Sequence, residues 1–227
     1  MSSAHFPPEF ALSPAAMASI DHLMQHRFGV STLQLMELAG LAVARAACAL
    51  LPNHEPRGAS ILILCGRGGN GGDGLVAARF LAAWGAHPSI VLSHSDDRLA
   101  PPTAHNLAAA RALSLPISTW SPATPTLDLP ASPSSEHSIT PSPSNLTPAL
   151  IIDALLGFGL SGPPTGPTAS LIRLANAHPA PILAVDLPSG LDATTGHPWD
   201  PCIRATRTLT LALPKTGLLG PARPPLP

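Results

Sequence analysis

Residues 59–85 read ASILILCGRGGNGGDGLVAARFLAAWG, and this stretch decides the fold. The run from Ile61 to Cys65 is apolar without interruption, which is typical of a strand buried on both faces of a parallel sheet. A glycine-rich turn follows, and the next residues predict a helix over 74–84 that ends at Gly85. A strand, a turn and a helix in this order are the repeating unit of an α/β protein.

Six of the ten residues from Cys65 to Gly74 are glycine. Gly66, Gly68 and Gly71 match the G-x-G-x-x-G pattern of dinucleotide-binding turns, in which backbone N–H groups approach a phosphate. Asn70 and Asp73 are unusual additions to this pattern, because an acid close to a pyrophosphate repels it. Asp73 therefore either caps the helix or accepts hydrogen bonds from ligand hydroxyls, and the sequence leaves both interpretations open.

The rest of the chain repeats the same unit. Hydrophobic periodicity predicts helices over 14–27, 31–52, 105–113 and 169–177, and strands over 89–93, 115–118, 149–153, 182–186 and 207–213. We therefore expect a doubly wound α/β sheet with right-handed crossovers. We expect one domain over 12–227, a flexible N-terminus over 1–11, and a disordered Ser/Pro-rich insertion over 121–149.

Composition limits the classes of function. The chain has 227 residues, a formal net charge of -1 and only 11% charged residues, so no electrostatic feature favours nucleic acid or an anionic membrane. Its 3 cysteines are far apart and form no zinc motif. The N-terminal residues lack a secretory signal pattern, so we expect a cytoplasmic protein, with a mitochondrial form as the open alternative.

Acidic residues end two further predicted strands. Asp153 precedes the loop LLGFGLSGP, and Asp186 precedes LPSGLD, which contains Ser189. Because ligands bind outside the carboxyl ends of parallel strands, these two loops and the glycine turn are expected to meet at one crevice. Oxygen ligands of these kinds favour a hard cation such as K⁺, Mg²⁺ or Ca²⁺ over zinc, and the same acids suit general acid catalysis.

Five stretches in this order resemble the NAD(P)H-hydrate epimerase family, the YjeF N-terminal domain. They are LQLMELAGLAVARAA (33–47), GRGGNGGDGLVAARFL (66–81), DALLGFGLSGP (153–163), VDLPSGLDATTG (185–196) and TLTLALPKTGLL (208–219). The resemblance implies a Rossmann-like three-layer α/β/α sandwich with a mostly parallel sheet, assembled as a homodimer. It also implies an isomerase that interconverts the R and S forms of hydrated NADH and NADPH (NADHX and NADPHX), with one bound K⁺ per subunit. A separate S-specific dehydratase would then restore the cofactor.

The resemblance also implies roles for individual residues. Asp186 would contact the substrate and is our candidate for the acid/base at the C6 hydroxyl, since burial can raise a carboxyl pKa toward neutrality. Asn70, Asp153 and Ser189 would hold K⁺. The other substrate contacts would come from the glycine turn, at Gly69, Asn70, Gly71, Gly72 and Asp73, and from a loop that closes over the ligand, at Gly157, Phe158, Gly159, Leu160, Ser161, Gly162 and Pro163. Lys215 is a weaker candidate, for a phosphate contact or for no role at the surface.

Two residues of the glycine turn differ from the pattern of the family that the chain resembles. Arg67 and Gly69 stand where family members often have Pro and Asn. An NAD-dependent dehydrogenase is one alternative, but it needs an acid at the end of its second strand, where Asp96 fits poorly. No G-x-S-x-G or P-loop motif is present, which disfavours a serine hydrolase or a P-loop NTPase. A non-catalytic ligand- or protein-binding member of the same fold is the other alternative.

Overall fold

The computed structural model describes residues 11–122 and 147–219, and its centre is a six-stranded sheet. The strands are β1 (Ser60–Cys65), β2 (His87–Leu92), β3 (Ile117–Thr119), β4 (Leu150–Ala154), β5 (Ile182–Val185) and β6 (Arg207–Leu209). They lie in the order β3-β2-β1-β4-β5-β6, and every neighbouring pair is parallel. The strand order reverses between β1 and β4, which is where open sheets of this kind form a ligand crevice.

Side chains of β1 alternate between two hydrophobic cores, one on each face of the sheet. Ile61 and Ile63 belong to one core and Leu62 and Leu64 to the other, and all four are fully buried. Each such aliphatic side chain stabilises the fold by about 1.5–3 kcal/mol. A strand buried on both faces has no polar side, which explains the uninterrupted apolar run in the sequence.

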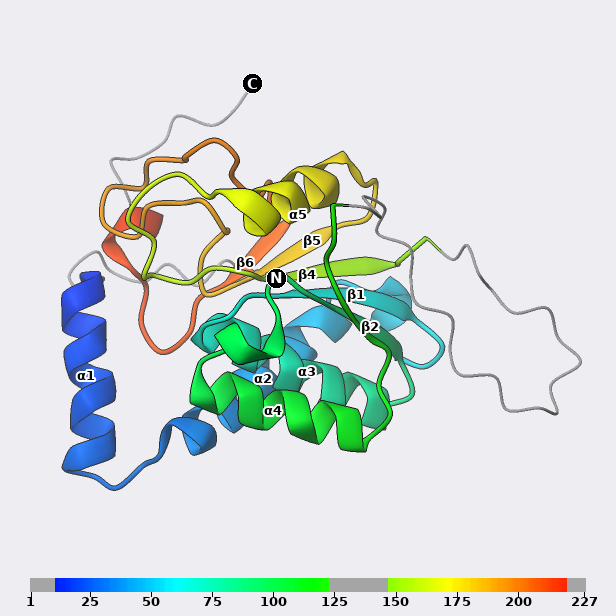
Figure 1. Ribbon diagram of the computed structural model, residues 1–227, viewed down its shortest axis with the longest axis horizontal. Helices are drawn as coiled ribbons and strands as arrows, with labels where there is room; N and C mark the ends of the chain where they lie inside the picture. The colour runs from blue at the N-terminus through cyan, green and yellow to red at the C-terminus, as the bar shows by residue number, and fades with distance from the viewer. Residues whose placement is uncertain (1–10, 123–146, 220–227) are drawn as a thin grey trace, which may run out of the picture.

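Helices cover both faces of the sheet, as Figure 1 shows. Helices α2 (Thr32–Cys48), α3 (Gly69–Ala83) and α4 (Pro101–Ala112) pack into the first core, whereas α5 (Gly166–Ala177) packs into the second. These are the three layers of an α/β/α sandwich, so the expected fold is confirmed, and its sheet is entirely parallel in the described residues. No helix of the described residues is long and apolar enough to cross a membrane.

Helix α1 (Pro14–His26) stands apart from the sandwich, at the left of Figure 1. Ser13 caps it by accepting a hydrogen bond from the Ala16 N–H, and Pro occupies its first position, as the sequence predicts. Leu12, the residue before the cap, attaches α1 to the C-terminal part of the described chain through backbone hydrogen bonds. The Leu12 N–H donates to Pro214 O at 2.8 Å, and the Thr216 N–H donates to Leu12 O at 3.0 Å.

Two predicted boundaries are wrong in an informative way. Helix α3 begins at Gly69 rather than Gly74, so most of the glycine run is helical, with Gly68 as the extended N-cap residue. Strand β6 ends at Leu209 rather than Leu213, because the Leu211 N–H leaves the sheet direction to donate to the Asp186 carboxylate. The predicted insertion over 121–149 falls mainly on residues 123–146, outside the described part of the chain.

Candidate active site

A cavity of about 770 Å³ opens at the carboxyl ends of β1, β4 and β5. Its walls come from α1, α2, the start of α3, and the loops that follow β4 and β6. The volume is within the range of sites that hold small molecules and cofactors. The cavity therefore lies at the reversal of strand order, where the sequence predicted the crevice.

The glycines of the turn serve close approach rather than left-handed backbone. A Cβ atom on Gly66 would lie 1.8 Å from Leu155 O, and one on Gly71 would lie 1.9 Å from Gly66 O. These two glycines let the first turn of α3 press against the ends of β1 and β4. Gly68 and Gly69 differ, because a Cβ on Gly68 would meet nothing within 4 Å and one on Gly69 only Met36 Cε at 3.9 Å. Both residues line the cavity.

The structure brings together only part of the predicted substrate contacts. The cavity lining includes Gly69, Asn70, Asp73, Gly157, Phe158, Gly159, Leu160 and Asp186. Five predicted contacts do not line it: Gly71, Gly72, Ser161, Gly162 and Pro163. Gly71 and Gly72 face inward, against Gly66 and Met36, because the segment is already helical.

Asp186 and Lys215 form a buried ion pair at the cavity wall. Their side chains are 3% and 1% exposed, and the Lys215 ammonium donates to Asp186 Oδ1. Lys215 also donates to Leu211 O at 2.9 Å, while the Leu211 N–H donates to Asp186 Oδ1 at 3.1 Å. The expectation of a surface lysine without a role is therefore wrong, while a phosphate contact of Lys215 stays a prediction. This pairing was not visible in the sequence, since the two residues are far apart in the chain.

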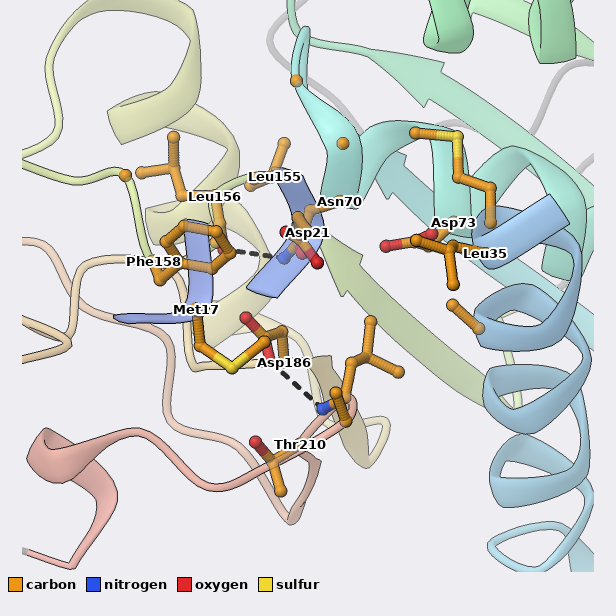
Figure 2. A pocket seen from close by; sticks show the side chains of 18 of the residues that line it. Met17, Asp21, Leu35, Asn70, Asp73, Leu155, Leu156, Phe158, Asp186 and Thr210 are labelled. Atoms are coloured by element: carbon orange, nitrogen blue, oxygen red, sulfur yellow. Dashed lines mark hydrogen bonds between the residues drawn. The ribbon is translucent and has the colours of Figure 1, made fainter. Parts of the chain in front are cut away.

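Two more carboxyl groups face the cavity: that of Asp21 from α1 and that of Asp73 from α3 (Figure 2). Burial, and secondarily the charges of Asp186 and Asp21, raise the pKa of Asp73 well above its ordinary value. Burial also raises the pKa of Asp21. Asp73 is inside α3 and past its first turn, so it does not cap the helix, and the ligand-facing interpretation is the one that remains.

The three predicted ion ligands lie close together: Asn70 lines the cavity, and Asp153 and Ser189 are buried next to it. Ser189 donates to Asp153 twice, from N–H to Oδ2 at 2.8 Å and from Oγ to Oδ1 at 2.6 Å. The Leu156 N–H donates to Ser189 Oγ at 2.8 Å, and Asn70 Nδ2 donates to Leu156 O at 2.8 Å. Asp153 is fully buried without a cationic partner among the described residues, and burial raises its pKa to about 6.

Sequence reasoning missed the residues that α1 contributes. Met17, Asp21 and Gln25 are four residues apart and all line the cavity, so one face of the helix forms part of the wall. The four-residue spacing of these side chains was visible in the sequence and places them on one helix face. The sequence did not show that the hydrogen bonds between Leu12 and the Lys215 segment hold α1 beside the site.

The fold and the site together define a class of protein. It is an α/β protein whose ligand crevice lies where the strand order reverses. Ionisable groups with raised pKa values line this crevice, which is common in the active sites of enzymes. The comparison with protein families is specific. The chain belongs to the family described as YjeF-related protein N-terminus, whose model matches residues 32–217.

Known relatives give the same picture. The bifunctional NAD(P)H-hydrate repair enzyme Nnr of Salinibacter ruber is 36% identical over 221 residues, covering 96% of this chain and 39% of the relative. The NAD(P)H-hydrate epimerase of Dehalogenimonas lykanthroporepellens is 36% identical over 204 residues, covering 89% of this chain and 74% of the relative. The crystal structure of the yeast protein ynu0 superposes with a TM-score of 0.73 at 25% identity, covering 92% of this chain and 83% of that one. The chain thus spans about two-fifths of the bifunctional relative and three-quarters of the epimerase.

Proposed function

We propose that this protein is an NAD(P)H-hydrate epimerase that interconverts the R and S forms of NADHX and NADPHX. The observation that carries the proposal is the buried Asp186–Lys215 pair, which shares one cavity with Asp73 at the glycine turn. The names of the relatives support the reaction and its substrates. A separate S-specific dehydratase would act on the product, and assembly as a homodimer stays a prediction.

The reaction needs one proton donor and one proton acceptor. Protonation of the C6 hydroxyl lets the C6–O bond break with loss of water, while the neighbouring ring nitrogen's lone pair forms a C=N bond. Water then adds to C6 from the other face and loses a proton to a carboxylate. The products have the same atoms and the same oxidation state as the substrate, so no redox cofactor takes part.

The environments of two carboxyl groups suit these two roles. Asp186 is the predicted acid/base, and it accepts hydrogen bonds from the Lys215 ammonium and from the Leu211 N–H at the cavity wall. Burial favours the protonated form of Asp73, which can donate a proton. We therefore extend the initial hypothesis, in which Asp186 acts alone, to include Asp73.

Three residues at the inner edge of the cavity fit a monovalent cation. Asp153 and Ser189 offer carboxylate and hydroxyl oxygens, which hard cations prefer, and the set carries a single negative charge. The Asn70 amide nitrogen donates to Leu156 O and Val185 O, which leaves the amide oxygen as the atom that a cation would bind. A cation would also offset the cost of the buried Asp153 carboxylate, which otherwise receives only neutral donors. We propose that these three side chains hold K⁺. The charge of this ion would hold the loop after β4 in place and would attract electron-rich groups of a substrate bound nearby.

A coupled assay tests the proposed reaction. Mixed R and S NADPHX are incubated with an S-specific dehydratase in K⁺ buffer, and the absorbance of recovered NADPH is followed. The dehydratase alone consumes the S form quickly and then proceeds at the rate of spontaneous epimerisation. We expect this protein to accelerate the second phase. We expect Asp186→Asn to slow it by about 10²–10⁴, whereas the exposed control Glu55→Gln leaves it unchanged.

The same assay separates an enzyme from a binding protein of the same fold. A folded protein that binds NADPHX but leaves the slow phase unchanged is a binding protein. Full activity in folded Asp186→Asn refutes the assignment of Asp186, and full activity in Asp73→Asn refutes that of Asp73.

A further inference from the structure

A basic cluster lies at the carboxyl end of β2, at one side of the cavity. It consists of Arg67, which follows β1, and of His94 and Arg98, which follow β2. Arg67 and His94 line the cavity, together with Ser93. None of these residues belongs to the acid, base or ion-binding set described above.

Backbone contacts hold the three residues close together. The Ser93 N–H donates to Cys65 O at 2.9 Å, which places the end of β2 beside the glycine turn. The Ala100 N–H donates to Arg67 O at 2.9 Å, which brings the loop after Arg98 to the same place. The charges of Arg98 and Arg67 both reach the His94 ring, where they add to burial in lowering its pKa. This corner of the cavity is therefore electropositive.

The two arginines are not engaged by acids. In the described residues, ion pairs join Arg79 to Glu37, Arg111 to Asp96 and Arg173 to Asp200, but none involves Arg67 or Arg98. The acids nearest to Arg98 in sequence are Asp96, which is paired with Arg111, and Asp97, which does not line the cavity. The acid nearest to Arg67 in sequence is Asp73, which lines the cavity but forms no ion pair among the described residues. An electropositive corner with free guanidinium groups suits a phosphate, which arginine binds through paired N–H groups.

The position of the cluster indicates which phosphate of a dinucleotide it would bind. In dinucleotide-binding sheets, the end of the second strand reads the adenosine ribose: an acid there binds the 2′-hydroxyl, and an arginine accommodates a 2′-phosphate. Here the cavity side of the β2 end presents Ser93 and His94 beside Arg67, without an acid. We propose that Arg67, His94 and Arg98 form a subsite for the 2′-phosphate, so that the protein prefers NADPHX to NADHX. This inference rests on the proposed function for the identity of the whole substrate.

Two nucleotides that differ only in this phosphate provide a direct test. Titration calorimetry would compare adenosine 2′,5′-bisphosphate with adenosine 5′-monophosphate, on the full chain at constant ionic strength. We expect the bisphosphate to bind about tenfold more tightly, the ordinary size of one charge-assisted contact. Arg67→Ala should remove most of this preference and leave the affinity for the monophosphate unchanged. Arg45→Ala is the matched control, because Arg45 is an exposed arginine of α2 outside the cavity.

Each result either supports or overturns the subsite. Equal affinity for the two nucleotides overturns it. An equal loss of both affinities in Arg67→Ala also overturns it, because Arg67 would then bind the 5′-phosphate that both share. Turnover gives a separate readout: a higher kcat/KM for NADPHX than for NADHX, lost in Arg67→Ala through KM, supports the subsite. A protein that shows the binding preference but no epimerisation refutes the proposed function and keeps the subsite, whereas equal turnover of both substrates refutes the subsite alone.

Discussion

Replacing Lys215 by methionine should destabilise the fold strongly, although the side chain keeps a similar length. Methionine cannot donate, so the Asp186 carboxylate would keep only the Leu211 N–H, and Leu211 O would lose its donor. Both side chains are almost fully buried, at 1% and 3% exposure, so water cannot replace the lost partner. Breaking a buried pair of this kind costs about 3–5 kcal/mol. For a chain of this length, that loss lowers Tm by about 6–20 °C.

A double-mutant cycle measures the pair itself. Urea unfolding would be recorded for the wild type, Lys215→Met, Asp186→Asn and the double variant. Asn is the suitable replacement because residue 186 has φ +67°, in the left-handed region that asparagine tolerates. We expect each single variant to lose several kcal/mol and the double variant to lose less than their sum, since it leaves no unpaired charge. A loss below about 1 kcal/mol in Lys215→Met, the level of a solvated surface pair, would refute the reasoning.

Three further predictions use other parts of the site. Burial raises the pKa of Asp73 well above its ordinary value and that of Asp153 to about 6, so the folded state keeps protons that the unfolded state releases above pH 3.8. The free energy of unfolding should therefore fall as the pH rises from 5 to 8, and it should fall less steeply in Asp73→Asn. Urea unfolding at several pH values measures this. Gly71→Ala should lower Tm sharply or prevent folding, because the new Cβ would lie 1.9 Å from a backbone oxygen. Gly69→Ala is the matched control: its Cβ would meet only Met36 Cε at 3.9 Å, so Tm should stay within a few degrees of the wild type. K⁺ should raise Tm above its value in choline chloride of equal ionic strength, and Asp153→Asn should abolish the difference; an equal effect of both salts would exclude a specific ion.

The parallel α/β class of the fold and the location of the crevice at the strand ends could be predicted because both depend on local signals. The apolar run of β1, the Pro and Ser at the start of α1, and the acids at strand ends are each readable within a few residues. Parallel topology then brings the strand ends to one edge without further information. The start of α3 was misread because glycine lowers helix propensity, while here tight packing against Gly66 and Met36 outweighs that cost.

The parts that escaped prediction depend on contacts between distant segments. Lys215 acquires its place from Asp186, in another loop, and Asp21 acquires its place because Leu12 is bound to the Lys215 segment. Arg67 and His94 meet through the register of β1 and β2. No short stretch of sequence encodes these meetings, so the charge pattern of the cavity required the structure.

The contact between Leu12 and the Lys215 segment also has a consequence for the order of events during synthesis. Strands β1, β2 and β3 are synthesised first and form one half of the sheet, and β4, β5 and β6 are then added outward from β1, one after another. Asp186 is therefore synthesised before its counter-charge, and α1 waits for its anchor until nearly the whole described chain has been made. A chain whose residues up to Pro214 have left the ribosome, with Lys215 still enclosed, should therefore hold all six strands described here but no functional site, so emergence of the Lys215 segment completes the site.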